Sequence, residues 1–126
     1  MLESADVIAF VPTREPAKAR AFYQKTLGLK FLSEDQFALV FDANGVMIRI
    51  ANVSSVKSFK PSAFTILGFH VSNAESVARQ LSKKGVVFER FAGMDQDALG
   101  IWDSPSGARV AWFKDPDGNI LSITQG

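Results

Sequence analysis

TREPAKARAFYQKTLGLKF, residues 13–31, predicts a helix that ends at a glycine and leads directly into a strand. Pro16 suits the first turn of such a helix, because the N–H that proline lacks would have no partner there. Gly28 stands where a left-handed residue commonly ends a helix. Helical spacing places four residues of the segment 17–27 on one face, which we expect to be buried: Ala19, Phe22, Tyr23 and Leu27.

The same order of elements occurs twice in the chain. The first half predicts a helix 17–27, an Asn44-Gly45 turn, and strands over 6–11, 29–32, 37–41 and 46–53. The second half predicts a helix 74–84 capped by Asn73, an Asp117-Gly118 turn, and strands over 65–71, 86–91, 108–114 and 119–124. In both halves the helix follows the first strand and the turn precedes the last. This match indicates a duplicated unit.

The duplication predicts an α+β fold of two tandem βαβββ modules, in which curved mixed sheets surround a cavity. One domain, residues 1–126, would consist of module one (1–53), a linker (54–62) and module two (63–126). The clearest difference between the halves is the additional segment 93–107, GMDQDALGIWDSPSG. Its glycines and proline around a tryptophan are typical of a flap over a cavity opening, and a dimer contact is the alternative.

Composition excludes several classes of function. The chain carries a net charge of +1, which gives no electrostatic footprint for nucleic acid. Cysteine is absent, so disulfides and thiolate chemistry are excluded, and His70 is the only histidine. No apolar run reaches the length of a membrane span, and the first residues do not read as a targeting segment. We therefore expect a cytoplasmic protein whose partners include neither nucleic acid nor a membrane.

Strand periodicity predicts which side chains face the cavity, because alternate residues of a strand point to opposite faces of its sheet. In module one the cavity-facing residues would be Ile8, Phe10, Met47 and Arg49. In module two they would be Ile66, Gly68, His70, Ile120, Ser122 and Thr124. Matching the two turns places Trp112 opposite Leu39 in the repeat, with both side chains toward the cavity.

The stretch TREPAKARAFYQKTLGLKF, the later KDPDGNILSITQ (114–125) and the paired βαβββ order resemble the vicinal oxygen chelate superfamily. That superfamily contains glyoxalase I, extradiol dioxygenases, fosfomycin resistance enzymes and bleomycin-binding resistance proteins. The resemblance covers essentially the whole chain, and it implies the two-module fold and a homodimer. It implies no single function, because this fold carries several chemistries and some pure binders.

For the enzymes of this superfamily, the resemblance implies a divalent metal held by His, Gln or Glu on the first and last strands of each module. Those positions correspond to Ile8, Arg49, Ile66 and Ser122 of this chain. Isoleucine has no lone pair, arginine is a permanent cation, and serine alone is a weak donor. A metal requires several converging N, O or S donors, so we expect neither a metal nor another cofactor.

Arg49 is the most informative polar residue on the predicted cavity face. A guanidinium in an apolar cavity pairs well with a carboxylate, phosphate or sulfate of a ligand. The alternatives are an ion pair with Glu3, Glu89 or another internal carboxylate, or a position at an open edge, because an unpaired buried charge is costly.

Several other residues are candidates for ligand binding or catalysis, and each also has a simpler structural explanation. His70 would be a general base or a donor to a ligand, although a half-exposed histidine at a strand end is the more common case. Trp102 and Trp112 would stack on a planar or cationic ligand, and Trp112 would equally suit the core. Asp95 and Asp97 form an acidic pair, which is more often a solvated loop tip than an acid–base site.

These features lead to three hypotheses of function, and they leave open whether the chain is an enzyme. The first is metal-independent binding of a small, largely apolar organic molecule, with aromatic or anionic ligands included, as in the drug-binding relatives. Arg49 would anchor the ligand and Trp102 would close the opening. His70 and Ser122 would be further polar contacts. The walls would be formed by Ile8, Phe10, Leu39, Met47, Ile66, Trp112 and Ile120. The second is a metal-dependent lyase, isomerase or dioxygenase of the same superfamily. The third is a non-catalytic regulatory module.

Overall fold

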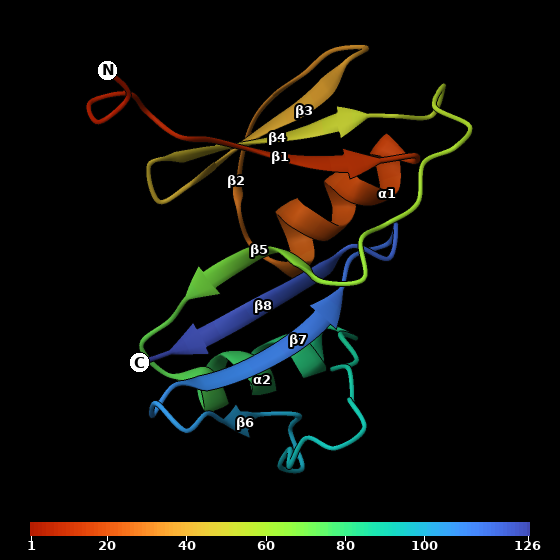
Figure 1. Cartoon of the computed structure of the whole chain (residues 1–126). Coiled ribbons are helices and arrows are strands. Elements are labelled where there is room, and N and C mark those ends of the chain that lie inside the picture. Colours follow the sequence, from red (N-terminus) through yellow and green to blue (C-terminus); the bar gives the residue numbers. More distant parts are fainter. The chain divides into compact units, whose positions relative to one another are not determined.

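The computed structural model describes all 126 residues, and the chain divides into two compact units, Met1–Lys60 and Pro61–Gly126. The division falls inside the segment 54–62 that we expected to be a linker. Each unit contains a strand, a helix and three further strands, and its four strands form one mixed sheet (Figure 1). The predicted α+β fold of two βαβββ modules is therefore confirmed. None of the helices is long and apolar enough to cross a membrane.

Unit 1 is a four-stranded sheet covered on one face by a helix (Figure 1). Its elements are β1 Ile8–Thr13, α1 Pro16–Ala21, the π-helical turn η1 Phe22–Thr26, β2 Lys30–Glu34, β3 Ala38–Ala43 and β4 Val46–Asn52. The strand order is β1-β4-β3-β2. The outer strand β1 runs parallel to β4, and the other neighbours are antiparallel.

The predicted helix 17–27 is α1 followed by the π-helical turn. Pro16 occupies the first helical turn, as its missing N–H predicts. After Ala21 the hydrogen bonds widen, and Leu27 N–H donates to the carbonyl of Phe22. Gly28 then takes a φ of 76°, which ends the helix as predicted. The wider turn lets Tyr23 reach the buried side of the sheet, where its ring centroid lies 6.1 Å from that of Phe41.

Unit 2 repeats this arrangement with a longer helix (Figure 1). Its elements are β5 Thr65–His70, α2 Ala74–Lys83, β6 Trp102–Asp103, β7 Arg109–Lys114 and β8 Ile120–Gln125. The strand order β5-β8-β7-β6 corresponds to that of unit 1, with β5 parallel to β8. The predicted cap is confirmed, since the Asn73 side chain accepts a hydrogen bond from Ser76 N–H.

The predicted strand 86–91 is wrong. Only Phe88 of this segment forms a β-bridge, with Phe113, and the adjacent Glu89 N–H donates to the carbonyl of Trp112. The other end of the β7 edge is occupied by β6. The edge strand of unit 2 is thus divided into two short pieces, and the residues 90–101 form an inserted loop between them. Segment 93–107 is therefore partly an insertion and partly the strand that corresponds to β2.

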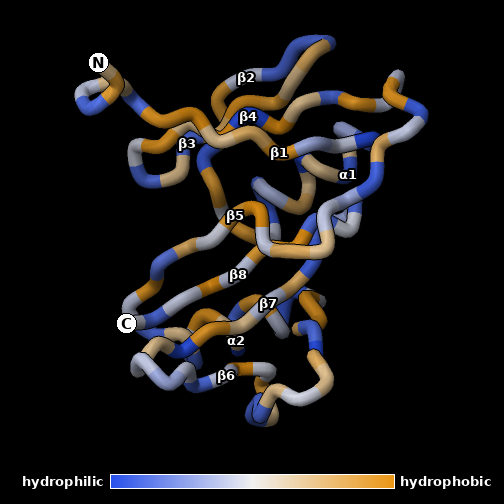
Figure 2. Tube along the Cα trace, viewed as in Figure 1, coloured by the Kyte–Doolittle hydropathy of each residue, from blue (hydrophilic) through white to orange (hydrophobic).

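Both sheets bury the face that the helix covers. In unit 1 the buried residues on this face include Val11, Ile48 and Ile50, and in unit 2 they include Ala111, Phe113 and Leu121. Figure 2 shows hydrophobic residues along the strands of both sheets and hydrophilic residues at several of the turns. The alternate strand residues form a second face in each unit, called the open face below, which the helix does not cover.

The predicted orientation of Leu39 is wrong. Leu39 pairs with Ile50 and is 1% exposed, so it belongs to the helix-covered face, and its neighbour Val40 pairs with Arg49 on the open face. The β3–β4 turn has two residues, Asn44 and Gly45, whereas five residues connect β7 to β8. Aligning the two glycines therefore shifts the strand before the turn by one residue, and a shift of one residue reverses the face.

Candidate ligand-binding site

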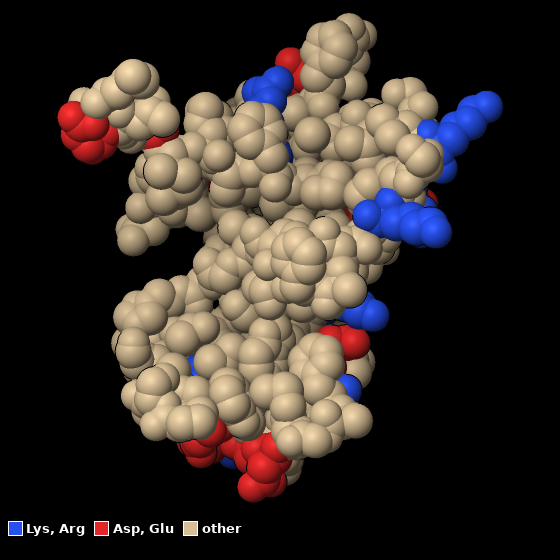
Figure 3. All heavy atoms as spheres, viewed as in Figure 1, with Lys and Arg blue, Asp and Glu red and all other residues tan.

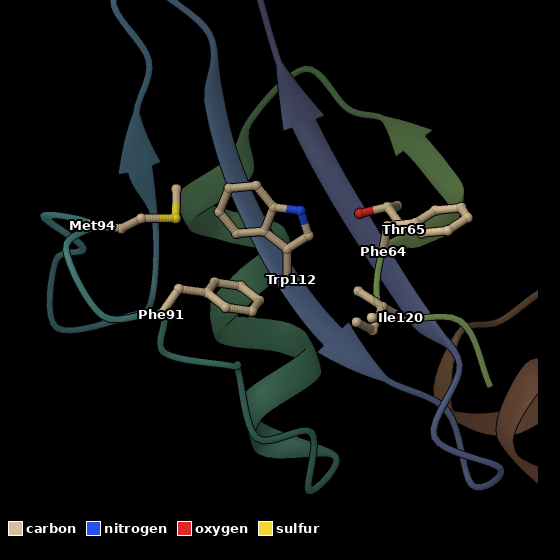
Figure 4. A pocket seen from close by; sticks show the side chains of 7 residues that line it. Phe64, Thr65, Phe91, Met94, Trp112 and Ile120 are labelled. Carbon is tan, nitrogen blue, oxygen red and sulfur yellow. The ribbon is translucent and has the colours of Figure 1, made fainter. Parts of the chain in front are cut away.

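An apolar pocket lies on the open face of unit 2, with a cavity volume of about 230 Å³. Figure 4 shows Trp112 of β7 between two groups of side chains. Phe91 and Met94 come from the inserted loop. On the other side, Phe64 directly precedes β5, Thr65 is the first residue of β5, and Ile120 is the first residue of β8. Ala63 completes the lining. The Thr65 hydroxyl and the Trp112 indole N–H are the only polar side-chain groups among these residues, so the pocket favours apolar ligand groups.

Aromatic rings extend from this pocket along the open face. The ring centroids of Phe91 and Trp112 lie 5.4 Å apart at an interplanar angle of 88°, which is an edge-to-face contact. The centroids of Trp102 and Trp112 lie 6.1 Å apart with a tilt of 36°. Trp112 therefore has an aromatic neighbour on each side. Since it is only half-buried, part of its surface stays accessible to a ligand.

The inserted loop is held in one conformation by two side chains. The Gln96 amide donates to the carbonyls of Glu89 and Gly100, and its oxygen accepts the N–H of Phe91. The Arg90 guanidinium donates to the carbonyls of Gln96, Asp97 and Ala98. These bonds satisfy backbone groups that leave the sheet at the insertion. They also fix Phe91 and Met94, so the wall of the pocket is preformed.

Asp97 has a structural role within this loop. One of its oxygens accepts hydrogen bonds from the N–H groups of Leu99 and Ile101, and the other lies 3.6 Å from Arg109. Arg109 also pairs with Asp103 at 3.0 Å, which connects β6 to β7. Asp95 is exposed at the loop tip. The pair Asp95 and Asp97 is therefore explained without acid–base chemistry.

The structure places Trp102 in β6, beside Trp112, rather than over the pocket as the predicted flap required. The residues that the loop contributes to the pocket are Phe91 and Met94. Neither residue carries a sequence signal for this role, because Phe91 ends an apolar segment typical of a strand and Met94 lies beside the acidic residues Asp95 and Asp97. Phe64 precedes a strand and carries no periodic signal either.

The other predicted residues of unit 2 are distributed around the sheet. Ser122 pairs with Gly68 and Trp112 on the open face but is buried, and a Cβ added at Gly68 would lie 3.0 Å from its hydroxyl oxygen. Ile66 lies in a strand irregularity between Thr65 and Leu67, and its neighbour Thr65 lines the pocket instead. His70 is exposed at the end of β5, where its Nε2 lies 3.4 Å from the carbonyl of Gly126.

The predicted residues of unit 1 share the open face of its sheet. Phe10, Arg49 and Val40 form one row across β1, β4 and β3, and Ile8 and Met47 lie in the next row. Phe10 is 61% exposed and Arg49 is half-buried. This part of the sheet therefore presents apolar side chains around one guanidinium.

Arg49 forms no hydrogen bond or ion pair within unit 1. Glu89, one expected partner, instead contacts Lys114 at 3.6 Å, and Glu3 contacts the amino group of Met1. The positive charge of Arg49 does reach Asp35, whose pKa is lowered mainly by hydrogen bonds from the N–H groups of Phe37 and Ala38 and to a smaller extent by Arg49. Within unit 1, Arg49 therefore does not form the alternative ion pair with Glu3.

The side chains present do not suit the divalent metal of the enzymes that the chain resembles. The four corresponding positions carry Ile8, Arg49, Ile66 and Ser122, which together offer one neutral oxygen donor and one permanent cation. Nowhere in the chain do three or more His, Asp or Glu side chains gather in a way that would hold a metal ion.

Charged groups are sparse on the side of the molecule shown in Figure 3, where acidic side chains gather at the end of unit 2 that holds β6. The pocket around Trp112 is thus bordered by an acidic loop but contains no charged side chain of its own.

The model of the Glyoxalase/Bleomycin resistance protein/Dioxygenase superfamily matches residues 5–123. Comparison with curated proteins finds no match. Among solved structures, the chain is similar to a member of the same superfamily from Sphaerobacter thermophilus, with a TM-score of 0.77, 19% identity and 100% of both chains covered.

Two further solved structures are similar over nearly their whole length. Lactoylglutathione lyase from Agrobacterium tumefaciens has a TM-score of 0.74 and 16% identity, covering 98% of this chain and 94% of that chain. TnmS3, an antibiotic binding protein from a Streptomyces species, has a TM-score of 0.72 and 22% identity, covering 99% and 98%. At such identities the likeness shows the fold alone, and the two names describe an enzyme and a binding protein.

Proposed function

Because the chain belongs to the glyoxalase/bleomycin resistance protein/dioxygenase superfamily, we propose that it binds a small, largely apolar organic molecule without a metal. The observation that carries this proposal is the pocket around Trp112, with its aromatic walls and a single hydroxyl group. The chain thus resembles in function the binding members of the superfamily, of which the antibiotic binding protein TnmS3 is a structural relative.

The size of the pocket limits the ligand. A cavity of about 150 Å³ is known to hold benzene, so the volume of about 230 Å³ suits one ring with substituents or two fused rings. Burial of apolar surface contributes about 25 cal/mol per Å², and a well-placed aromatic contact adds roughly 0.5–1.5 kcal/mol. Phe91 and Trp112 already stand nearly perpendicular, so a planar ligand can lie against one ring and meet the edge of the other.

The donor chemistry supports binding without a metal. The superfamily's metal-dependent reactions need several N or O donors around one ion, and the corresponding residues of this chain do not supply them. Elemental analysis of the purified, dialysed protein is the direct check. We expect less than a stoichiometric amount of Fe, Mn, Ni or Zn, and a stoichiometric amount would instead support the lyase, isomerase or dioxygenase hypothesis.

Arg49 is proposed as an anchor for an anionic group at the open face of unit 1. It has no ion-pair partner in that unit, and Phe10 and Val40 flank it. Arg49→Ala should weaken binding of an anionic ligand while leaving the melting temperature of the free protein nearly unchanged. If the affinity for an anionic ligand is unchanged in Arg49→Ala, Arg49 is not an anchor. A large loss of stability would mean that the role of Arg49 is structural.

A thermal-shift screen of metabolites and drugs identifies the ligand class, since a compound that binds only the native state raises the melting temperature. We expect hits among planar aromatic compounds and a smaller shift in Trp112→Ala, because the ring is the centre of the pocket. Phe37→Ala is the matched control, since Phe37 is an exposed aromatic residue of unit 1 and does not line the pocket. Hits that depend on added divalent metal, or that are equal in both variants, would contradict the proposal.

A further inference from the structure

A second pocket lies entirely within unit 1, on the open face of the sheet near the β3–β4 turn, with a cavity volume of about 340 Å³. It differs in character from the pocket around Trp112, because carboxylates stand among its apolar walls. The lining residues are Asp6, Val7, Ile8, Leu32, Asp42, Gly45 and Met47. We propose that this pocket is a binding site for an organic cation, namely a primary or secondary ammonium group on an apolar body.

The charge of the pocket supports a cation. Asp6 and Asp42 are the only side chains in the lining that carry charge or hydrogen-bonding groups, and neither forms an ion pair or hydrogen bond within unit 1. Lys30 stands opposite Asp42 in the β2–β3 register, yet its amino group is not within ion-pair distance of that carboxylate. Arg49 lies one row further along β4 and is not part of the lining. The lining therefore contains two carboxylates that have no cationic partner within unit 1.

The apolar walls define the rest of the ligand. Ile8 and Met47 are cross-strand neighbours on β1 and β4, and they are 47% and 39% exposed. Leu32 is 47% exposed opposite them, at the irregularity in β2. A hydrocarbon chain or ring lying on these side chains would remove their surface from water, which favours binding by about 25 cal/mol per Å². The ammonium group would then lie at the carboxylates.

Small inorganic cations fit this pocket less well than an organic one. Divalent metals need more oxygen donors than two carboxylates provide, and the remaining lining atoms are hydrocarbon or the backbone of Gly45. An alkylammonium ion uses both parts of the lining, since its three N–H donors match carboxylate acceptors and its chain matches the walls.

The methionines provide one reporter for each pocket. Met47 lines the pocket of unit 1, Met94 lines the pocket of unit 2, and Met1 is fully exposed. Methyl-labelled methionine in the full chain therefore gives three signals in an NMR titration, and Met1 serves as the internal control. Hexylammonium, hexanol and hexanoate form a matched series of probes that differ only in the charged end.

Hexylammonium should move the Met47 signal saturably, with an affinity at least fivefold above those of hexanol and hexanoate. Asp6→Asn and Asp42→Asn should each weaken hexylammonium binding roughly threefold to fivefold, as expected for partly exposed charge pairs. Asp95→Asn is the control, because it removes the same charge from a loop of unit 2 and should change nothing.

Equal affinities for hexylammonium and hexanol would overturn the proposal, as would unchanged binding in both Asp variants. A response of Met94 without one of Met47 would also overturn it. None of these results affects the proposed binding of aromatic ligands at the Met94 pocket, because that pocket is lined by residues of unit 2 alone. Failure of the aromatic screen would likewise leave the Met47 titration valid.

Discussion

At the scale of single residues, Asp35 accepts hydrogen bonds from the local backbone and is also affected by the charge of Arg49 on the open face. Its carboxylate accepts the N–H groups of Phe37 and Ala38 at 2.8 and 2.9 Å and so holds the turn between β2 and β3. Those bonds, with a smaller effect of Arg49, lower its pKa below the ordinary value of 3.8. A carboxyl group whose folded-state pKa is lowered stabilises the protein above its unfolded pKa, and this contribution disappears as the pH falls through the folded value.

Asp35→Asn should therefore lower the melting temperature at neutral pH, and the difference from the wild type should shrink as the pH falls below the ordinary aspartate pKa of about 4. Thermal unfolding followed by circular dichroism across this range measures it. Asp95→Asn, which alters an exposed carboxylate with no hydrogen-bond partner, should show no such trend. A difference between Asp35→Asn and the wild type that persists at the acid end would show that the carboxylate charge is not the cause.

Residue-level prediction succeeded where local chemistry alone decides the conformation. The helix start at Pro16, the left-handed Gly28 and the Asn73 cap depend on one or two backbone groups, and all three are confirmed. The predicted orientation of Leu39 depended on aligning the final turns of the two halves. These turns differ in length, so the alignment was wrong by one residue. Arg49 could be placed on the open face, but its lack of an ion-pair partner depends on three-dimensional distances.

At the scale of elements, the inserted loop 90–101 contributes both to the stability of unit 2 and to the wall of the pocket around Trp112. Gln96 makes two hydrogen bonds to the backbone of this loop and a third to the carbonyl of the preceding Glu89, and the loop supplies Phe91 and Met94 to the pocket. Gln96→Ala should cost about 1–3 kcal/mol of stability, because each lost bond contributes roughly 1 kcal/mol. It should also weaken binding of an aromatic ligand, since the ordered wall is lost.

Urea unfolding and a ligand titration measure the two effects of Gln96→Ala separately. Gln80→Ala on α2 is the matched control, because Gln80 bonds only to the exposed Ser76 hydroxyl and contacts no pocket. Stability loss with unchanged affinity would contradict the view that Gln96 holds the pocket wall in place.

The apolar strand segments bounded by turn residues were predicted well, with β4, β5 and β7 close to their expected bounds. The apolar segment 86–91 looked like a further strand, because sequence alone cannot show that an insertion displaces its second part from the sheet edge. Arg90 and Gln96 hold the inserted loop by donating hydrogen bonds to backbone carbonyls several residues away. Such contacts leave no periodic pattern in the sequence.

At the scale of the whole molecule, the duplication predicted from the sequence is the feature that led to the fold and the family. The resemblance also implies a homodimer, which we retain as a prediction. Light scattering coupled to size-exclusion chromatography should give twice the mass of one chain. Phe10→Glu should shift this mass toward the monomer if the exposed apolar open face of unit 1 contributes to the contact. A monomer mass for the wild type would contradict the expectation.

The central claim is that the pocket around Trp112 binds an apolar aromatic molecule without a metal. The most direct measurement is a fluorescence titration of Trp102→Phe, in which Trp112 is the only remaining tryptophan, after dialysis against EDTA. We predict saturable quenching by a hit of the screen at one ligand per unit 2, with an affinity that added divalent metal does not change. Quenching that appears only after a metal is restored, or an absence of quenching by every hit, would contradict the claim.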